Sequence, residues 1–278
     1  MNFVKMHGLG NDFVVVHIQE EVPANASELA IRLCDRHFGV GADGLVYITP
    51  SAKANAAMRI FNADGSEAEQ CGNAVRCVAK YVWDRGLVSS SDIAIETKGA
   101  GVQRVAVEAE GGRAVRVKVD MGEPILEGPR IPTTLPDPLL VRRPIEAGGR
   151  SFQFTGVSMG NPHCVIEVAD AASFEVDVWG PKLERHPWFP NRTNVEFITV
   201  ESRDRAVMRV WERGAGQTLA CGTGACAVLV ASVLDGKMDR EATIELAGGE
   251  LRIEWDEATN RVWMTGAAEE VYEGRWLG

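Results

Sequence analysis

The chain has 278 residues, of which 45% are hydrophobic and 24% charged, so it can build a folded core and is not a disordered protein. Its length predicts two domains or one large one. The 29 basic and 39 acidic residues give a net charge of −10, which argues against binding to a nucleic-acid backbone or an anionic membrane surface. We therefore expect no nucleic-acid partner and no membrane partner.

The sequence shows no signal for export. Residues 1–10 lack an apolar signal region, and the most apolar stretch, residues 225–234, is far shorter than the ~20 residues that span a bilayer. Six cysteines in a chain of this length do not form a dense disulfide framework. We expect a cytoplasmic protein whose thiols stay reduced.

Short β-branched runs dominate the predicted elements in chain order. They cover residues 13–18, 45–48, 58–61, 102–107 and 115–121 in the first half, and 165–168, 195–200, 207–211, 243–246, 251–255 and 261–264 in the second. Helical patterns cover residues 28–36, 71–84 and 221–234. Five prolines between residues 129 and 144 predict an ordered connector between two lobes.

The two halves of the sequence repeat each other at an offset of 150 residues. Gly-Asn pairs open β runs at residues 10–11 and 160–161, and further matches join residues 44–48 to 194–198, 58–62 to 208–212, and 71–72 to 221–222. The alternative is a chance alignment of common β patterns, but the Cys-Gly and Gly-Asn pairs fall in the same register. We interpret the chain as two copies of one α+β unit.

Each unit is expected to wrap a mixed or antiparallel sheet around its own central helix, because an apolar helix must be buried. The predicted fold is thus two pseudo-symmetric lobes. We assign residues 1–120 and 267–278 to the first lobe and residues 121–266 to the second.

Cys71 and Cys221 begin the two central helices, and a glycine follows each of them. The first N–H groups of a helix lack internal partners and carry the positive end of its dipole, so they bind carboxylates and lower the pKa of a thiol. Two facing helix starts would grip one carboxylate and hold a thiol on either face of the neighbouring carbon. This arrangement suits inversion at an acidic C–H centre, in which a thiolate removes the proton and a thiol returns one to the opposite face.

Other uses of the cysteines and glycines fit less well. Free cysteines are often simply buried, which is our interpretation of Cys34, Cys77, Cys164 and Cys226. Because there is no C-x-x-C pair, zinc is a weaker alternative and we expect no metal. Neither glycine-rich stretch, at residues 8–10 or 214–216, completes a dinucleotide-binding motif.

Seven segments in order resemble the diaminopimelate epimerase family along nearly the whole chain. They are GLGNDF (8–13), FNADGSE (61–67), QCGN (70–73), GNPH (160–163), TNV (193–195), WERG (211–214) and ACGTG (220–224). The resemblance implies a pyridoxal-independent enzyme with no cofactor, cytoplasmic and commonly homodimeric. It would interconvert LL- and meso-2,6-diaminopimelate in the lysine and peptidoglycan pathway.

The resemblance also implies roles for individual residues. Cys71 and Cys221 would be the catalytic acid and base. Hydrogen bonds to the carboxylate at the reacting centre would come from Gly72, Asn73, Gly222 and Thr223. The rest of the substrate would be held by Asn11, Asn62, Asn161, Asn194 and Arg213. His163 and Glu212 would tune the thiol pKa values, and Glu212 would also bind a substrate ammonium.

Several alternatives stay open at this point. An asparagine can be a turn residue, His163 a structural imidazole and Arg213 a solvated surface charge. Gly44 stands where many family members carry glutamine, so we give it no ligand role. Other functions to consider are a proline-racemase-like or phenazine-biosynthesis-like isomerase of the same fold, and a non-catalytic redox-sensing or zinc-binding thiol protein.

Overall fold

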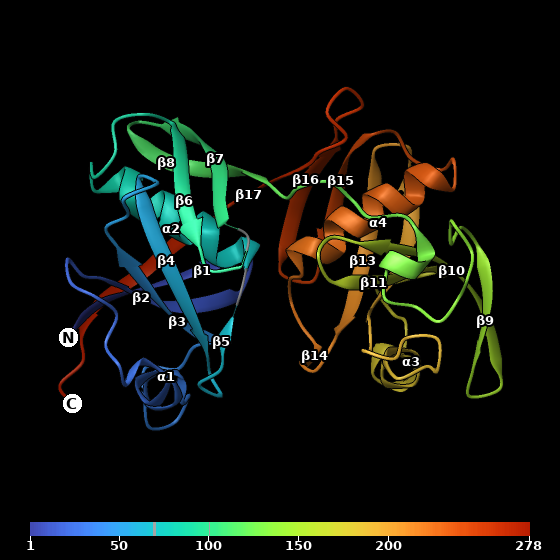
Figure 1. The fold of residues 1–278 in the computed structure, drawn as a ribbon, viewed down its shortest axis with the longest axis horizontal. Coiled ribbons are helices and arrows are strands. Elements are labelled where there is room, and N and C mark those ends of the chain that lie inside the picture. The colour runs from blue at the N-terminus through green and yellow to red at the C-terminus, as the bar shows by residue number, and fades with distance from the viewer. Residues whose placement is uncertain (69–70, 100) are drawn as a thin grey trace. The chain divides into compact units, whose positions relative to one another are not determined.

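The computed structural model describes residues 1–68, 71–99 and 101–278. Gln70, part of one motif above, lies outside the described residues. The chain divides into two compact units, Met1–Asp120 with Thr265–Gly278, and Met121–Met264. Both termini belong to the first unit (Figure 1), where the amino group of Met1 donates a hydrogen bond to the Trp276 carbonyl. Over the described residues, no helix is both long and apolar enough to cross a membrane.

The first unit is a mixed sheet packed around helix α2 (Gly72–Asp84), as Figure 1 shows. Its strands are β1 (Asn2–Gly8), β2 (Asn11–His17), β3 (Gly44–Thr49), β4 (Ala56–Asn62), β5 (Glu67–Ala68), β6 (Asp92–Thr97), β7 (Gly101–Glu110), β8 (Arg113–Asp120) and β18 (Glu269–Arg275). They pair in the order β18-β1-β2-β3-β4-β6-β7-β8, with β5 also on β4. Helix α1 (Ala26–Cys34) covers β3 and β4 on the other face.

The second unit has the same plan around helix α4 (Gly222–Leu234). Its strands are β9 (Arg143–Ala147), β10 (Arg150–Ser158), β11 (Pro162–Glu167), β12 (Asn194–Ser202), β13 (Arg205–Glu212), β14 (Gly216–Gln217), β15 (Glu241–Leu246) and β16 (Gly249–Trp255). Strand β17 (Val262–Gly266) begins in this unit, and its last two residues are assigned to the first. They pair in the order β9-β10-β11-β12-β13-β15-β16, with β14 also on β13. Helix α3 (Val176–Glu184) packs on β12 and β13.

The duplication predicted from the sequence is confirmed by the strand pairing. Antiparallel, parallel and antiparallel pairs join β1 to β4 in succession, and the same series joins β10 to β13. Even the register repeats: Leu45 pairs with Phe61, and Val195 pairs with Trp211, 150 residues further on. The α+β fold of two sheets, each around a central helix, is therefore the one the sequence indicated.

The central helices form because each has a sheet to bury it. The residues of α4 are nearly all small or apolar, while α2 also buries Arg76 and Lys80, whose side chains donate to the carbonyl oxygens of Ala267 and Ala114. In α4 nearly every residue is buried, from Gly222 to Ser232, and α2 is buried over Asn73–Val82. Burial of such helices removes their apolar area from water at roughly 25 cal/mol per Å². Because this burial holds the helix in place, the position of the first residue of each helix is also fixed.

Two expectations about the order of elements need correction. The proline-rich segment is not a connector between the units, because it belongs to the second unit and anchors there through Ile131 and Leu140, both fully buried. Helix α3 was missed, although it lies 150 residues after α1, where the repeat places it. Its internal Pro181 and Gly180 disguise the helical pattern.

Candidate active site

Cys71 is the N-cap residue of α2, in extended conformation, and Gly72 opens the helix. The Cys71 thiol lies 3.8 Å from the side-chain oxygen of Asn11, to which it donates a hydrogen bond. The same oxygen accepts a hydrogen bond from Asn73 Nδ2 at 3.1 Å. Three residues predicted for the site, from β2 and the start of α2, thus meet in the first unit.

A charged network holds Asn11 in place. Its Nδ2 donates to Asp43 at 2.8 Å, and Arg36 bridges Asp43 and Asp12 at 2.8 and 2.9 Å. Burial alone would raise the pKa of Asp12, but hydrogen bonds from Arg36 and Lys5 outweigh it and lower the pKa to about 2. Asp12 therefore stays ionised, and the turn that carries Asn11 is tied to the start of β3.

Cys221 occupies the equivalent N-cap position of α4 and is 4% exposed. Its sulfur lies 3.7 Å from the Thr223 hydroxyl, and its thiol donates a hydrogen bond to Glu212, at the end of β13. Glu212 also accepts a hydrogen bond from Thr218. Burial raises the pKa of the Glu212 carboxyl, and these two hydrogen bonds oppose that shift.

The expectation that the helix start lowers the thiol pKa is wrong for Cys221. Burial raises the pKa of the Cys221 thiol well above its usual value, and the carboxylates of Glu212 and Glu196 raise it further. The Thr223 hydroxyl and the Gly224 N–H act in the opposite direction. The N-terminal dipole is thus outweighed by a buried, acidic setting that only the folded unit creates.

Asn161 and His163 lie behind Thr223. Asn161 Nδ2 donates to the Thr223 hydroxyl at 3.3 Å, and Asn161 Oδ1 lies 3.0 Å from His163 Nε2. On its other side, His163 Nδ1 lies 2.7 Å from Glu196 Oε1, and both side chains are fully buried. The predicted residues Asn161, His163 and Thr223 therefore form one continuous network with Cys221.

The remaining predicted residues take more peripheral places. Asn194 is buried and links two loops, because its Nδ2 donates to the Pro162 carbonyl and its Oδ1 accepts from the Arg213 N–H, both at 2.9 Å. Among the described residues, the guanidinium of Arg213 donates to the Asn191 carbonyl at 3.5 Å.

In the first unit, Asn62 ends β4 and donates to Ser66 in the following turn at 3.0 Å. Gly44 pairs with Asn62 across the strands, and a Cβ at Gly44 would lie 3.1 Å from the Phe61 carbonyl oxygen. A side chain at this position would therefore press on the neighbouring strand.

Sequence reasoning missed Glu196, Thr218 and Asp43, which contact the predicted residues directly. Glu196 leaves a signal in the sequence, because it is a lone charge in the otherwise apolar run Val195–Ile198. Thr218 and Asp43 lie in short glycine- and alanine-containing loops, and nothing in their local pattern sets them apart.

The other four cysteines are buried, as expected. Burial raises the pKa of Cys34 and of Cys77 to about 12 and that of Cys164 well above its usual value, so these thiols stay protonated. Across residues 1–68, 71–99 and 101–278, no group of three or more His, Cys, Asp or Glu side chains is placed to hold a metal ion.

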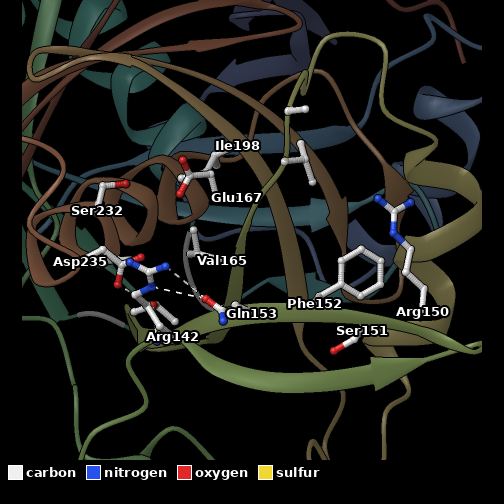
Figure 2. Close-up of a pocket in the computed structure, with 14 residues that line it drawn as sticks. Arg142, Arg150, Ser151, Phe152, Gln153, Val165, Glu167, Ile198, Ser232 and Asp235 are labelled. Atoms are coloured by element: carbon white, nitrogen blue, oxygen red, sulfur yellow. Dashed lines mark hydrogen bonds between the residues drawn. The ribbon is translucent and has the colours of Figure 1, made fainter.

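A cavity of about 630 Å³ in the second unit lies away from these residues (Figure 2). Ser232 and Asp235 line it from the far end of α4, Arg142 from the residue just before β9, and Gln153 from β10. Since α4 is 13 residues long, about 20 Å of helix separates this cavity from Cys221. None of the predicted site residues lines it.

Solved structures establish the class of fold. The chain is similar to a probable proline racemase from Agrobacterium radiobacter K84, at 17% identity and a TM-score of 0.73, over 99% of this chain and 92% of that one. It is also similar to a Bacillus anthracis phenazine biosynthesis protein of the PhzF family, at 16% identity and a TM-score of 0.72, over 100% and 99%. At such low identity these likenesses define the fold that the chain shares with these proteins.

The sequence comparisons then give the family. The model of the family described as diaminopimelate epimerase matches residues 3–127 and 155–271. Relatives named diaminopimelate epimerase include one from Acetivibrio thermocellus, 54% identical over 99% of this chain and 98% of its own length, and one from Methanococcus maripaludis, 50% identical over 99% of each. The chain belongs to the diaminopimelate epimerase family, and the resemblance carried by the seven motifs is confirmed.

Proposed function

We propose that this chain interconverts LL- and meso-2,6-diaminopimelate by moving an α-proton between two thiols, those of Cys71 and Cys221. Family membership supports the substrate and the isomerase activity. The observation that carries the mechanism is the equivalence of the two cysteines: each is the N-cap of the central helix in its copy of the duplicated unit. A duplicated fold that keeps a thiol at the same place in both copies suits a reaction needing two similar proton-transfer groups.

The chemistry follows from what surrounds each sulfur. One thiolate takes the α-proton as a general base, and the other thiol donates a proton to the opposite face of the same carbon. The α-carboxylate gains negative charge as the proton leaves. The N–H groups at the starts of α2 and α4, that of Thr223 included, stabilise that charge together with the Asn73 side chain.

The thiol form of Cys221 is favoured before the reaction, because burial and Glu212 raise its pKa. In the direction in which Cys221 starts as a thiol, it acts as the proton donor and Cys71 as the base. In the reverse direction the roles exchange. Once Cys221 is a thiol again, its S–H group donates a hydrogen bond to the Glu212 carboxylate.

The other predicted residues would bind the polar substrate. Its two zwitterionic ends need amides and charged partners, which Asn11, Asn62, Asn161, Asn194 and Arg213 supply. Gly72 and Gly222 leave the helix N–H groups uncovered, while His163 and Glu212 tune the thiols. The resemblance to the family also supports a cytoplasmic homodimer that acts in lysine and peptidoglycan precursor synthesis; sedimentation of the purified chain measures the oligomeric state.

Deuterium incorporation from D₂O tests the proposal. The purified chain is incubated with LL-diaminopimelate, and product and recovered substrate are separated and examined by mass spectrometry. Two-base transfer places deuterium at the α-carbon of the product well before it appears in recovered substrate. Early label in recovered substrate would indicate a single exchanging base, and conversion of proline or glutamate in place of diaminopimelate would refute the substrate assignment.

A further inference from the structure

Glu196 is a carboxyl group with no exposed surface, placed beneath the start of α4. It lies in β12, and a Cβ built on Gly224 would come within 2.9 Å of its Oε1 and 3.1 Å of the Cys221 sulfur. Its second oxygen, Oε2, is buried and has no hydrogen-bond partner among the described residues. Burying a carboxyl in this way costs several kcal/mol unless a partner compensates. Its partner here is His163.

A chain of hydrogen bonds leads from this carboxyl to the sulfur of Cys221. The contacts are Glu196 Oε1 to His163 Nδ1 at 2.7 Å, His163 Nε2 to Asn161 Oδ1 at 3.0 Å, Asn161 Nδ2 to Thr223 Oγ1 at 3.3 Å, and Thr223 Oγ1 to Cys221 Sγ at 3.7 Å. All five residues belong to the second unit. We name this chain of five residues the Glu196 relay.

The relay has a direction. Asn161 Nδ2 donates to the Thr223 hydroxyl, and the other side-chain atom of Asn161, Oδ1, can only accept a hydrogen bond. His163 Nε2 must therefore carry a proton and donate it to Asn161 Oδ1. One further proton then lies between His163 Nδ1 and Glu196. Since the Thr223 oxygen already accepts from Asn161, its own hydrogen is available to the sulfur. Every donor in the relay points toward Cys221.

Cys221 needs such donors to become a thiolate. Among the described residues of its unit, the titratable groups around it are Glu212 from β13, Glu196 from β12 and, behind Asn161, His163 from β11. Burial and the two carboxylates oppose the thiolate. The Thr223 hydroxyl and the Gly224 N–H are the contacts that favour it.

We propose that Glu196 is a positioning residue for Cys221: by fixing the His163 proton toward Asn161, it turns the Thr223 hydroxyl toward the sulfur, and the resulting hydrogen bond stabilises the thiolate by more than the nearby Glu196 charge destabilises it. This rests on the proposed function, which makes Cys221 one of the two proton-transfer groups. No bond forms or breaks along the relay, because the proton in transfer moves only between the substrate carbon and the sulfur. Glu196 acts through three other side chains and does not touch the sulfur.

The test measures the reactivity of the Cys221 thiol without substrate. In a Cys71→Ala background, the rate of methylthiolation of Cys221 by a small thiosulfonate is followed by mass spectrometry from about pH 6 to 9, where the rate tracks the thiolate fraction. Glu196→Met removes the relay's anchor at similar size. We expect a rate roughly tenfold lower at a given pH, equivalent to a pKa about one unit higher. Glu196→Gln can still donate to His163 Nδ1, so its rate should lie closer to that of the parent.

The direction of the change separates the relay from a simple charge effect. If Glu196 acted only as a nearby negative charge, removing it would lower the pKa and speed the reaction; a faster or unchanged rate in Glu196→Met overturns the proposal. Circular dichroism checks the fold of each variant. If Glu196→Met does not fold, Thr223→Val breaks the last link instead and should slow the reaction, while Thr223→Ser should restore it. Equal rates in Thr223→Val and the parent would also overturn the proposal.

Turnover gives an independent readout. With Cys71 intact, Glu196→Met should lower kcat roughly tenfold and leave KM within about twofold, since Glu196 does not reach the substrate. If the unsubstituted chain fails to epimerise diaminopimelate, the proposed function is wrong. The methylthiolation rates of Cys221 still test the Glu196 relay in that case. If turnover occurs and the thiol rates move the wrong way, the relay alone is wrong.

Discussion

Gly224→Ala adds one methyl group close to both the Glu196 carboxyl and the Cys221 sulfur. The new Cβ would lie 2.9 Å from Glu196 Oε1, 3.1 Å from Cys221 Sγ and 3.1 Å from Met208 Cε. Distances this short require neighbours to shift. Glu196 is fully buried and held by His163, so it cannot swing into solvent.

Two opposing contributions set the effect on stability. Alanine favours a helix over glycine by up to about 1 kcal/mol, and Gly224 lies in α4. Overpacking of a filled site costs about 1–3 kcal/mol. The free energy of unfolding should therefore fall by no more than about 2 kcal/mol. The effect on kcat should be larger, a fall of about 10- to 100-fold. Small displacements of reacting groups slow the reaction strongly, and the new methyl group pushes apart the residues of the Glu196 relay.

Gly156→Ala provides the matched control. A Cβ there would meet Leu140 at 3.1 Å, a similar overpacking in the same unit, but it touches only apolar atoms away from the site. Urea unfolding followed by tryptophan fluorescence gives the stability of both variants, and chiral separation of diaminopimelate isomers gives kcat. We expect similar losses of stability and a loss of kcat in Gly224→Ala only. A kcat within twofold of the parent in Gly224→Ala, or an equal fall in Gly156→Ala, would refute this reasoning.

Four further substitutions test other parts of the structure. Cys71→Ala and Cys221→Ala should each lower epimerisation by a factor on the order of 10³ or more with the circular dichroism spectrum unchanged; substantial activity in either contradicts the two-thiol mechanism. Because the folded pKa of Asp12 is depressed from 3.8 to about 2, ionised Asp12 contributes about 2 kcal/mol of stability above pH ~4, and this is lost as pH falls toward 2. Asp12→Asn should remove that contribution at neutral pH and flatten the acid decline in urea titrations, whereas an unaltered pH profile would count against it. Ser232→Ala deletes a buried hydroxyl with no hydrogen-bond partner among the described residues, so the free energy of unfolding should stay constant or rise by up to about 1 kcal/mol, and a loss above 1 kcal/mol would show a partner.

The sequence by itself determined the architecture and the two central thiols. Hydrophobic patterns locate β3, β4 and α4 because those elements are local and mostly apolar, and the helical spacing of apolar residues locates α2. The constant offset of 150 residues exposes the duplication. The same offset is enough to make Cys71 and Cys221 equivalent positions of the two copies. It also points to α3, where Pro181 and Gly180 hide the pattern from propensity alone.

Only the tertiary structure decided the electrostatics around Cys221. Helix-start physics predicts a lowered thiol pKa there, but β12 and β13 bring Glu196 and Glu212 beside a buried sulfur and reverse the shift. Glu196 and His163 are separated by 33 residues, and they meet because β11 and β12 are parallel neighbours. A local pattern fixes which face of a strand a side chain occupies; the charge opposite it depends on strand order and register, which long-range pairing sets.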